Sequence, residues 1–456
     1  MREHYIGISK SATTRHELSV GQVERFQHTH VIGQTGTGKS HFLKQSFMQD
    51  IYAGFGGCFF DFHGEDARWF LDHIPPERLD DVIYFNPLDA ESAVGYNVID
   101  GIDPADYANF TDDIVASLRH IFADAWGGRM DDILTMAIRP LFDLPGESRG
   151  TMLGVVRMLN DPFYRSWVVK QCRDQTVRDF WLSEYAGWSK NDKAHNLNSS
   201  LNKIRRFQSS PILQRCLGQQ KSRISFKRAI EQGQIVICDF NKWRMGAKNA
   251  STLASLIISR LIYEGTRRAS VVGRPSIPFH IYIDEFQTVT SLSAIEALSG
   301  IRKYRVGFTL ADQYASQISD PVLNAIKGNV GTRIVFRVGG EDADRLQRGM
   351  DITNAKELTE LSDFNFVAQY KNGNSVSTKR GATEPLDWER FGYGRSIERQ
   401  CQAKYGLPVA EVDETYARWM QSRHYGGAVA GATVKKEGQG SRVARGMQSL
   451  GRIMRS

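Results

Sequence analysis

Residues 33–40 read G-Q-T-G-T-G-K-S, and the rest of the chain can be arranged around this stretch. A glycine, four further residues and then Gly-Lys-Ser form the pattern of a loop that binds the phosphates of a nucleotide. Its glycines let the backbone curl so that N–H groups point inward. Lys39 would place a positive charge on the β- and γ-phosphates, and the Ser40 hydroxyl would ligate Mg²⁺. A glycine-rich turn that matches the pattern by accident is the plainer alternative.

The flanking sequence favours the phosphate-binding alternative. Residues 28–32 (H-T-H-V-I) predict a buried strand, and residues 40–51 predict a helix whose N-terminus faces the phosphates. The residues expected to contact ATP are Gly33, Gln34, Thr35, Gly36, Thr37, Gly38, Lys39, Ser40 and His41.

A second motif lies far down the chain, where residues 279–286 read F-H-I-Y-I-D-E-F. This is an apolar strand that ends in two acids. Asp284 would hold the hydration shell of Mg²⁺, and Glu285 would orient and deprotonate the attacking water. Gln313 follows the apolar strand 306–310 and would lie at the same sheet edge, where its amide can report the γ-phosphate. The acid pair is weak evidence alone, but together with residues 33–40 it predicts an enzyme that hydrolyses a nucleoside triphosphate.

Apolar strands alternate with helical stretches, which predicts an α/β fold with a mainly parallel sheet. Further strands are expected at 56–62, 82–85, 234–240 and 329–338, with a late, antiparallel strand at 364–370. Residues 1–27 are expected only to lead into the first strand, and no strand is expected after Lys371. The predicted domains are 1–103 (first part of the core), 104–232 (inserted all-α domain), 233–372 (second part of the core) and 373–456 (C-terminal extension with a basic, partly disordered tail).

Composition limits the class of protein. The 456 residues are 41% hydrophobic and 24% charged, as in ordinary globular proteins. No apolar run is long enough to span a bilayer, and residues 1–10 lack the apolar segment of a secretory signal. Five scattered cysteines without a CxxC pair favour reduced thiols and a cytoplasmic location over a disulfide framework or a zinc site.

The net charge of +7 is concentrated near the C-terminus. Residues 421–456 carry seven basic residues and one acid, whereas the remainder carries 51 basic and 50 acidic residues. Attraction to nucleic acid must therefore come from local patches or from this tail. Residues 442–456 could form a short basic amphipathic helix on a partner, on DNA or on an anionic membrane surface, or could remain a disordered solubilising tail.

Several polar residues allow two interpretations. Asp61, His63 and Glu65 follow the strand 56–62, so they either approach the nucleotide or form a loop that caps a helix. Arg25 precedes the first strand, where it either reaches a nucleotide or subunit interface or is a solvated charge. The basic segment with Lys190, Lys193, Lys203, Arg205 and Arg206 is either a solvated helix face or a surface that touches DNA phosphates.

The order of segments resembles the HerA/FtsK-type ring motors, in particular the conjugative DNA transfer ATPases of the type IV coupling kind. Five stretches carry the resemblance: HTHVIGQTGTGKS, FDFHGED, IYIDEFQ (281–287), IRKYR…LADQ (301–313) and NVGTRIVFRVGGEDA (329–343). The last two are specific to this group. A helical domain inserted in the core is similar to the all-α domain of coupling proteins.

The resemblance implies a RecA-like core and an ATP-driven, usually hexameric, ring that pumps DNA. Lys39, Ser40, Asp284 and Glu285 match the nucleotide and hydrolysis positions, and Gln313 matches the sensor glutamine. Arg302 matches an arginine that reaches the ATP of a neighbouring subunit, and Arg25 matches a second such position less well. Residues 241–248 (N-K-W-R-M-G-A-K) are a basic candidate for a DNA-contacting loop.

Two other functions stay open at this point. A secretion ATPase could move protein, and a nucleotide-gated adaptor could recruit partners through its basic tail. Membrane-bound coupling proteins carry N-terminal transmembrane helices, which this sequence lacks. Accessory or channel proteins that bind 373–456 would be one route to a membrane complex.

Overall fold

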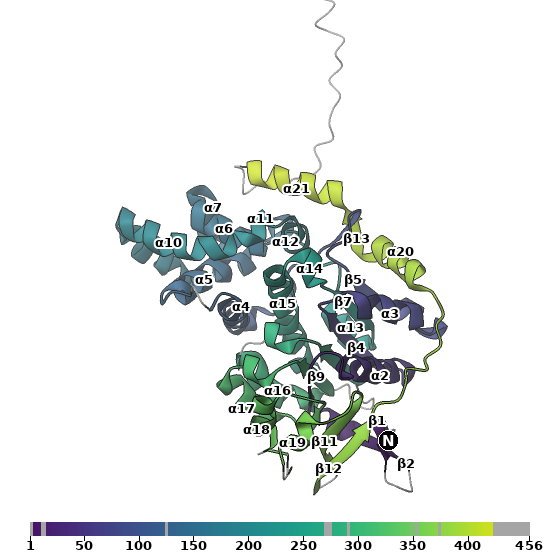
Figure 1. Cartoon of the computed structure of the whole chain (residues 1–456). Helices are drawn as coiled ribbons and strands as arrows, with labels where there is room; N and C mark the ends of the chain where they lie inside the picture. Colours follow the sequence, from purple (N-terminus) through teal and green to yellow (C-terminus); the bar gives the residue numbers. More distant parts are fainter. Residues whose placement is uncertain are drawn as a thin grey trace, which may run out of the picture.

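The computed structural model in Figure 1 describes residues 3–10, 15–123, 126–268, 276–289, 292–347, 349–350, 352, 354–372 and 375–422. One large sheet organises these residues, and its strands run in the order β2-β1-β12-β11-β10-β3-β9-β8-β4-β7-β5. The seven strands from β10 to β5 are parallel to one another, whereas β11, β12, β1 and β2 add an antiparallel extension. The predicted α/β fold with a mainly parallel sheet is confirmed.

The parallel strands have the continuous apolar character that burial on both faces requires. Every residue of β7, β8 and β9 is buried. The parallel strands are β10 (Thr332–Val335), β3 (Thr29–Ile32), β9 (Val306–Asp312), β8 (Phe279–Ile283), β4 (Gly56–Asp61), β7 (Ile235–Asp239) and β5 (Val82–Phe85). Each was expected from its apolar run.

Helices cover both faces of this sheet. From β3 to β4 to β5 the chain crosses the sheet in one direction, and from β5 through β7 and β8 to β9 it returns. Because crossover connections are right-handed, α2 (Lys39–Tyr52) and α3 (Glu65–His73) lie on one face, and α15 (Ala247–Thr266) and α16 (Leu292–Ile301) lie on the other. Figure 1 shows this division, with the strands between the two groups.

A group of helices separates β6 (Ser92–Val94) from β7, and most of it stands at one side of the molecule (Figure 1). Its helices are α4 (Tyr107–Ile121), α5 (Met130–Ile138), α6 (Met152–Asn160), α7 (Pro162–Gln171), α8 (Gln175–Asp179), α9 (Tyr185–Gly187), α10 (Lys190–Ile204), α11 (Arg206–Ser209) and α12 (Pro211–Leu217). The following helix, α13 (Phe226–Gln232), packs against β4 and α15 instead. The exact limits of the helical insert stay a prediction.

Three strands of the large sheet were missed, as was the separate two-stranded sheet of β6 and β13. The pair β1 (Glu3–Lys10) and β2 (Arg15–Gly21) lies in the segment expected only to lead into the core, and β12 (Ser375–Ala382) lies beyond Lys371. β12 pairs with β11 (Asn365–Asn372), so the sheet continues past the predicted end of the core. Most β12 side chains are exposed or half-buried. Without a buried face, its sequence lacks the alternation that marks a strand.

After β12 the chain runs back along the molecule as a strap, residues 383–421, seen at the right and top of Figure 1. It carries α20 (Gly394–Tyr405), β13 (Gly406–Pro408) and α21 (Val409–Gln421). α20 packs on α3 and β5, β13 pairs with β6, and α21 packs on α12. The strap therefore joins the large sheet and its covering helix α3 to the helical group.

Within the described ranges, no helix has the length and apolar character needed to cross a membrane. The five cysteines are buried and free, as their scatter predicted. The predicted disordered tail and the amphipathic helix at 442–456 lie outside the described residues.

Candidate nucleotide site

The loop at 33–38 connects β3 to α2 and is fixed by the ends of two neighbouring strands. The Gly33 N–H donates to the Asp312 carbonyl (3.3 Å), and the Gln34 N–H donates to the Arg337 carbonyl (2.9 Å). Gly38 has a φ of 118°, which side chains disfavour, and a Cβ there would meet Phe336 at 3.0 Å. Glycine at position 38 is therefore required by both conformation and space.

Lys39 and Ser40 open α2 at the end of this loop. The Lys39 side chain is buried, its Nζ donates to the Gln34 carbonyl (3.3 Å), and burial lowers its pKa. Asp284, Asp312 and Glu285 oppose that shift, so these carboxylates lie within electrostatic reach of the ammonium. Ser40 is exposed.

His41, also expected near the nucleotide, is turned toward the strap. Its Nε2 donates to the Glu384 carbonyl (2.5 Å), and its ring stands edge-on to Phe364. The imidazole thus links α2 to the C-terminal segment.

The acid pair follows β8, at the same sheet edge as the loop. Burial raises the pKa of Asp284 to about 6, although Lys39 acts in the opposite direction. Glu285 has a φ of 52°, a left-handed conformation that is uncommon outside glycine, and its N–H donates to Asp284 Oδ1 (2.9 Å). Such strained backbone is concentrated at functional sites.

The Glu285 carboxylate is held by side chains from the ends of three other strands. His63 Nε2 donates to Oε1 (3.0 Å), Gln313 Nε2 lies 3.5 Å from the same oxygen, and Lys242 Nζ donates to Oε2. Burial by itself would raise the pKa of Glu285, but the hydrogen bonds from His63 and Lys242 lower it to about 2. The bond to Glu285 also raises the pKa of His63. We call Glu285, His63, Lys242 and Gln313 the Glu285 cluster.

Two members of the site were not assigned from sequence. Lys242 was considered only as part of a DNA-contacting loop, and Asp312 only as part of the LADQ stretch that ends at Gln313. Asp312 is fully buried, pairs with His30 (2.9 Å) and accepts from the Gln287 N–H (2.9 Å). It therefore ties β3 and β9 to the turn after Glu285. A carboxylate at the end of an otherwise apolar strand is the signal that could have identified it.

Residues 61, 63 and 65, for which two interpretations were open, have different environments. Asp61 caps α3, because its carboxylate accepts from the N–H groups of His63 (2.8 Å), Gly64 (2.9 Å) and Ala67 (2.7 Å). His63 reaches Glu285, whereas Glu65 is exposed in the first turn of α3. The capping interpretation is right for Asp61, whereas His63 contacts Glu285 and its approach to a nucleotide stays a prediction.

Arg25 has neither of its predicted environments. It is buried, and it donates to Asp50 Oδ2 (2.9 Å) and to the Tyr282 hydroxyl (2.8 Å). We call Arg25, Asp50 and Tyr282 the Arg25 cluster. The expectation of a solvated charge or an interface residue is wrong, since α2 and β8 supply buried partners that local sequence cannot reveal.

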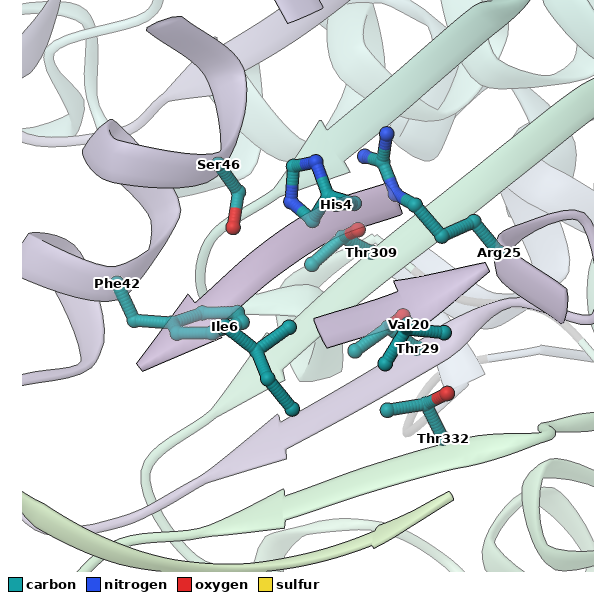
Figure 2. Close-up of a pocket in the computed structure, with 9 residues that line it drawn as sticks. All are labelled: His4, Ile6, Val20, Arg25, Thr29, Phe42, Ser46, Thr309 and Thr332. Atoms are coloured by element: carbon teal, nitrogen blue, oxygen red, sulfur yellow. The ribbon is translucent and has the colours of Figure 1, made fainter. Parts of the chain in front are cut away.

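Figure 2 shows Arg25 at the wall of a small interior cavity between β1, β2, α2 and strands β3, β9 and β10. Ser46 and Thr332 line this cavity, and their hydroxyl oxygens are buried without a hydrogen-bond partner among the described residues. The cavity is separate from the loop at 33–38.

Arg302 is exposed in the turn before β9. β9 runs parallel to β3, so the two ends of β9 lie at opposite edges of the sheet. Its seven residues span about 20 Å, at roughly 3.3 Å each. Gln313 lies at the edge of the phosphate loop, and Arg302 lies at the other edge.

The residues present fit a magnesium ion that is held mainly by nucleotide phosphates and water. Ser40 and Asp284 offer the hard oxygen ligands that Mg²⁺ prefers. Among the described residues, no group of three His, Cys, Asp or Glu side chains could hold a metal alone.

The fold and the loop together define a P-loop protein with a RecA-like core. Comparison with known families adds that residues 16–153 match the model of the type IV secretion-system coupling protein DNA-binding domain. No curated protein matches the chain. The resemblance to type IV coupling ATPases of the HerA/FtsK kind is confirmed.

Solved structures share the fold at low sequence identity. The unbound bacterial conjugative coupling protein TrwBdeltaN70 has a TM-score of 0.61 at 14% identity, and the match covers 84% of this chain and 90% of that one. The plasmid coupling protein TrwB in complex with ADP and Mg²⁺ also gives 0.61 at 14%, covering 82% and 88%. VirB4 of Thermoanaerobacter pseudethanolicus gives 0.55 at 11%, covering 84% and 97%.

Proposed function

We propose that this chain hydrolyses ATP with Mg²⁺ and uses the energy to move DNA, as the motor of a type IV transfer system. The observation that carries the proposal is the convergence of Lys39, Asp284 and Glu285 at one sheet edge, although the loop and the acid pair are far apart in sequence. In parallel α/β sheets this edge is where ligands bind.

Each side chain has a distinct role in this proposal. Backbone N–H groups of the loop and Lys39 hold the phosphates, Ser40 and Asp284 hold Mg²⁺, and Gln313 senses the γ-phosphate. The ion, when bound, neutralises charge that develops on the transferring phosphoryl group. Glu285 accepts a hydrogen bond from the attacking water, orients it in line with the γ-phosphate and takes its proton.

A ring would complete the site. Arg302 lies at the edge opposite its own phosphate loop, so its exposed guanidinium is better placed to serve the ATP of a neighbouring subunit. An arginine supplied in trans stabilises charge in the transition state and makes hydrolysis depend on assembly. We therefore propose a homo-oligomer, with a hexamer as the expected form.

DNA is the proposed cargo, because the matched family model describes a DNA-binding domain and the similar TrwB structures are coupling proteins. Motors that grip phosphates select their substrate largely without regard to sequence. The strap and the residues beyond it offer a surface for accessory or channel proteins at a membrane complex.

The test is ATP turnover with and without single- and double-stranded DNA, at a fixed salt concentration. Lys39→Ala should keep the wild-type melting temperature and lose turnover. Wild-type turnover in Lys39→Ala would show that the site is wrong. Turnover that ignores DNA would favour a secretion ATPase that moves protein.

The trans arginine is tested by mixing two inactive proteins. Arg302→Ala and Glu285→Gln subunits should regain turnover together, because a mixed interface can combine an intact arginine with an intact glutamate. Mixtures that remain as inactive as either variant alone would contradict a role for Arg302 in trans.

A further inference from the structure

Lys242 connects the glutamate of the site to an exposed aromatic surface. It opens α14 (Lys242–Met245), the short helix that follows β7. Its Nζ donates to Glu285 Oε2, and the same ammonium lies 5.6 Å from the centre of the Trp243 ring. One cation is therefore shared between a carboxylate of the nucleotide site and an aromatic ring.

Trp243 is 80% exposed, which is unusual for a residue of this size. Exposed cations follow it in sequence at Arg244 and Lys248, whose ammonium lies 6.0 Å from the centre of the Phe122 ring, and no acidic residue occurs between Asp239 and Glu264. The exposed Trp243 therefore lies in a segment that carries positive charge and no acid.

The helical group contributes to the same surface. Arg206 Nη1 donates to Asn249 Oδ1 (3.3 Å), and Asn249 Nδ2 donates to Ser210 Oγ (3.1 Å). These bonds bring the basic segment around Arg205 and Arg206 next to the start of α15. We define the Trp243 surface as Trp243, Arg244, Lys248, Arg205 and Arg206.

An exposed aromatic ring among cations fits a nucleic-acid strand with unpaired bases. Such a base can stack on the ring, and the neighbouring phosphates pair with the cations. A duplex keeps its bases stacked on each other and offers only its phosphates. The surface therefore favours single-stranded DNA.

The backbone at Lys242 is fixed while its side chain can move. The Lys242 N–H donates to the Phe62 carbonyl (2.9 Å), and the Asn241 side chain accepts from the Arg244 N–H (3.2 Å). The four-carbon stem of lysine can swing its ammonium from one acceptor to another. A DNA phosphate at the Trp243 surface is a competing acceptor.

We propose that single-stranded DNA binds the Trp243 surface and withdraws Lys242 from Glu285, so that ATP is hydrolysed when DNA is engaged. Without DNA, Lys242 holds one carboxylate oxygen away from the attacking water. With DNA, that oxygen is released while His63 still orients the carboxylate. Lys242 is thus a positioning residue, and this gate rests on the proposed ATPase function.

The first test removes the ammonium. Lys242→Met should raise DNA-free ATP turnover about tenfold, the value of one charge-assisted hydrogen bond, and should reduce the stimulation by oligo(dT) to a similar extent. Lys242→Arg keeps a cation and should restore low DNA-free turnover. Lys227→Met, at an exposed lysine on α13, is the matched control and should behave as wild type.

The second test removes the ring. Trp243→Ala should raise the oligo(dT) concentration for half-maximal stimulation about tenfold, as loss of one stacked base predicts. Phe163→Ala, at a residue of α7 that is 70% exposed, is the control.

The outcomes separate the gate from the function on which it rests. DNA-free turnover of Lys242→Met at or below the wild-type value would overturn the gate, and so would equal stimulation of wild type and Trp243→Ala. A change in oligomeric state in Trp243→Ala would assign the surface to a subunit interface instead. Wild-type turnover no higher than that of Lys39→Ala, with and without DNA, would overturn the ATPase proposal itself.

Discussion

Two clusters of charge lie on the central sheet, and they differ in how far water reaches them. In the Glu285 cluster, the side chains of Lys242 and His63 are 20% and 41% exposed. In the Arg25 cluster, the side chains of Arg25 and Asp50 are 5% and 2% exposed. Both clusters pair a carboxylate with at least one cationic side chain. Only the Glu285 cluster is open to solvent on one side, where a substrate could replace one of the paired side chains.

The difference separates a structural role from a chemical one. Charges buried without water are held in place by one another, because losing a single partner leaves an uncompensated charge. Charges at a solvent-facing edge can be re-paired at small cost. We therefore expect changes in the Arg25 cluster to alter stability and changes in the Glu285 cluster to alter turnover.

The largest effect is expected from Glu285→Gln. An amide cannot take a proton from water, so ATP turnover should fall about 10²–10⁴-fold while nucleotide binding is kept. Steady-state hydrolysis and nucleotide titration measure the two properties. Glu65→Gln, at an exposed acid of α3, serves as the control. Unchanged turnover in Glu285→Gln would show that Glu285 does not act in hydrolysis.

The Arg25 cluster should respond in stability. Arg25→Met leaves the buried Asp50 carboxylate without its guanidinium counter-charge, which should lower the free energy of unfolding by about 3–5 kcal/mol in urea titrations. Arg390→Met breaks an exposed pair with Asp72 and should cost at most about 1 kcal/mol. Loss of turnover in Arg25→Met without loss of stability would instead revive the interface role first considered for Arg25.

Acid should lower the stability of the fold through His28, a buried histidine directly before β3. Burial lowers the pKa of His28 to about 4, and its ring accepts from the Phe308 N–H (3.1 Å) while donating to the Leu298 carbonyl (2.9 Å). The unfolded chain therefore binds the proton more tightly. Stability should be complete above about pH 6.5 and fall by roughly 3 kcal/mol as the pH drops toward 4.

His28→Asn tests this pH dependence, because asparagine tolerates the left-handed backbone at this position and does not titrate. The free energy of unfolding should depend less steeply on pH between 6.5 and 4 in the variant. His4 and His280, whose pKa values are also lowered by burial, should keep part of the slope. An unchanged slope would exclude His28 as the main source.

The smallest effect is expected where the strap meets the helical group. Arg215 Nε donates to Asp413 Oδ1 (2.8 Å), and the two side chains are 31% and 40% exposed. A double-mutant cycle with Arg215→Ala and Asp413→Ala should give a coupling of about 0.5 kcal/mol in unfolding experiments. A coupling of several kcal/mol would mean that exposure does not set the strength of these pairs.

The sequence by itself determined the elements whose signals are local. The loop at 33–40, the acid pair after β8 and the seven parallel strands all follow from spacing and from apolar runs that burial on both faces requires. The strands β1, β2 and β12 were missed, because the contact that joins their two hairpins into one sheet, β1 with β12, is made between distant segments. β12 in particular has little apolar surface to announce it.

Only the tertiary structure decided the environment of individual charges. Lys242 and His63 reach Glu285 from the ends of β7 and β4, and Arg25 finds Asp50 on α2 and Tyr282 on β8. Whether a charged side chain is solvated, catalytic or structural depends on partners supplied by other strands. The fold brings parallel strands from distant parts of the chain side by side. No single stretch of sequence therefore reveals which partners a charged side chain will have.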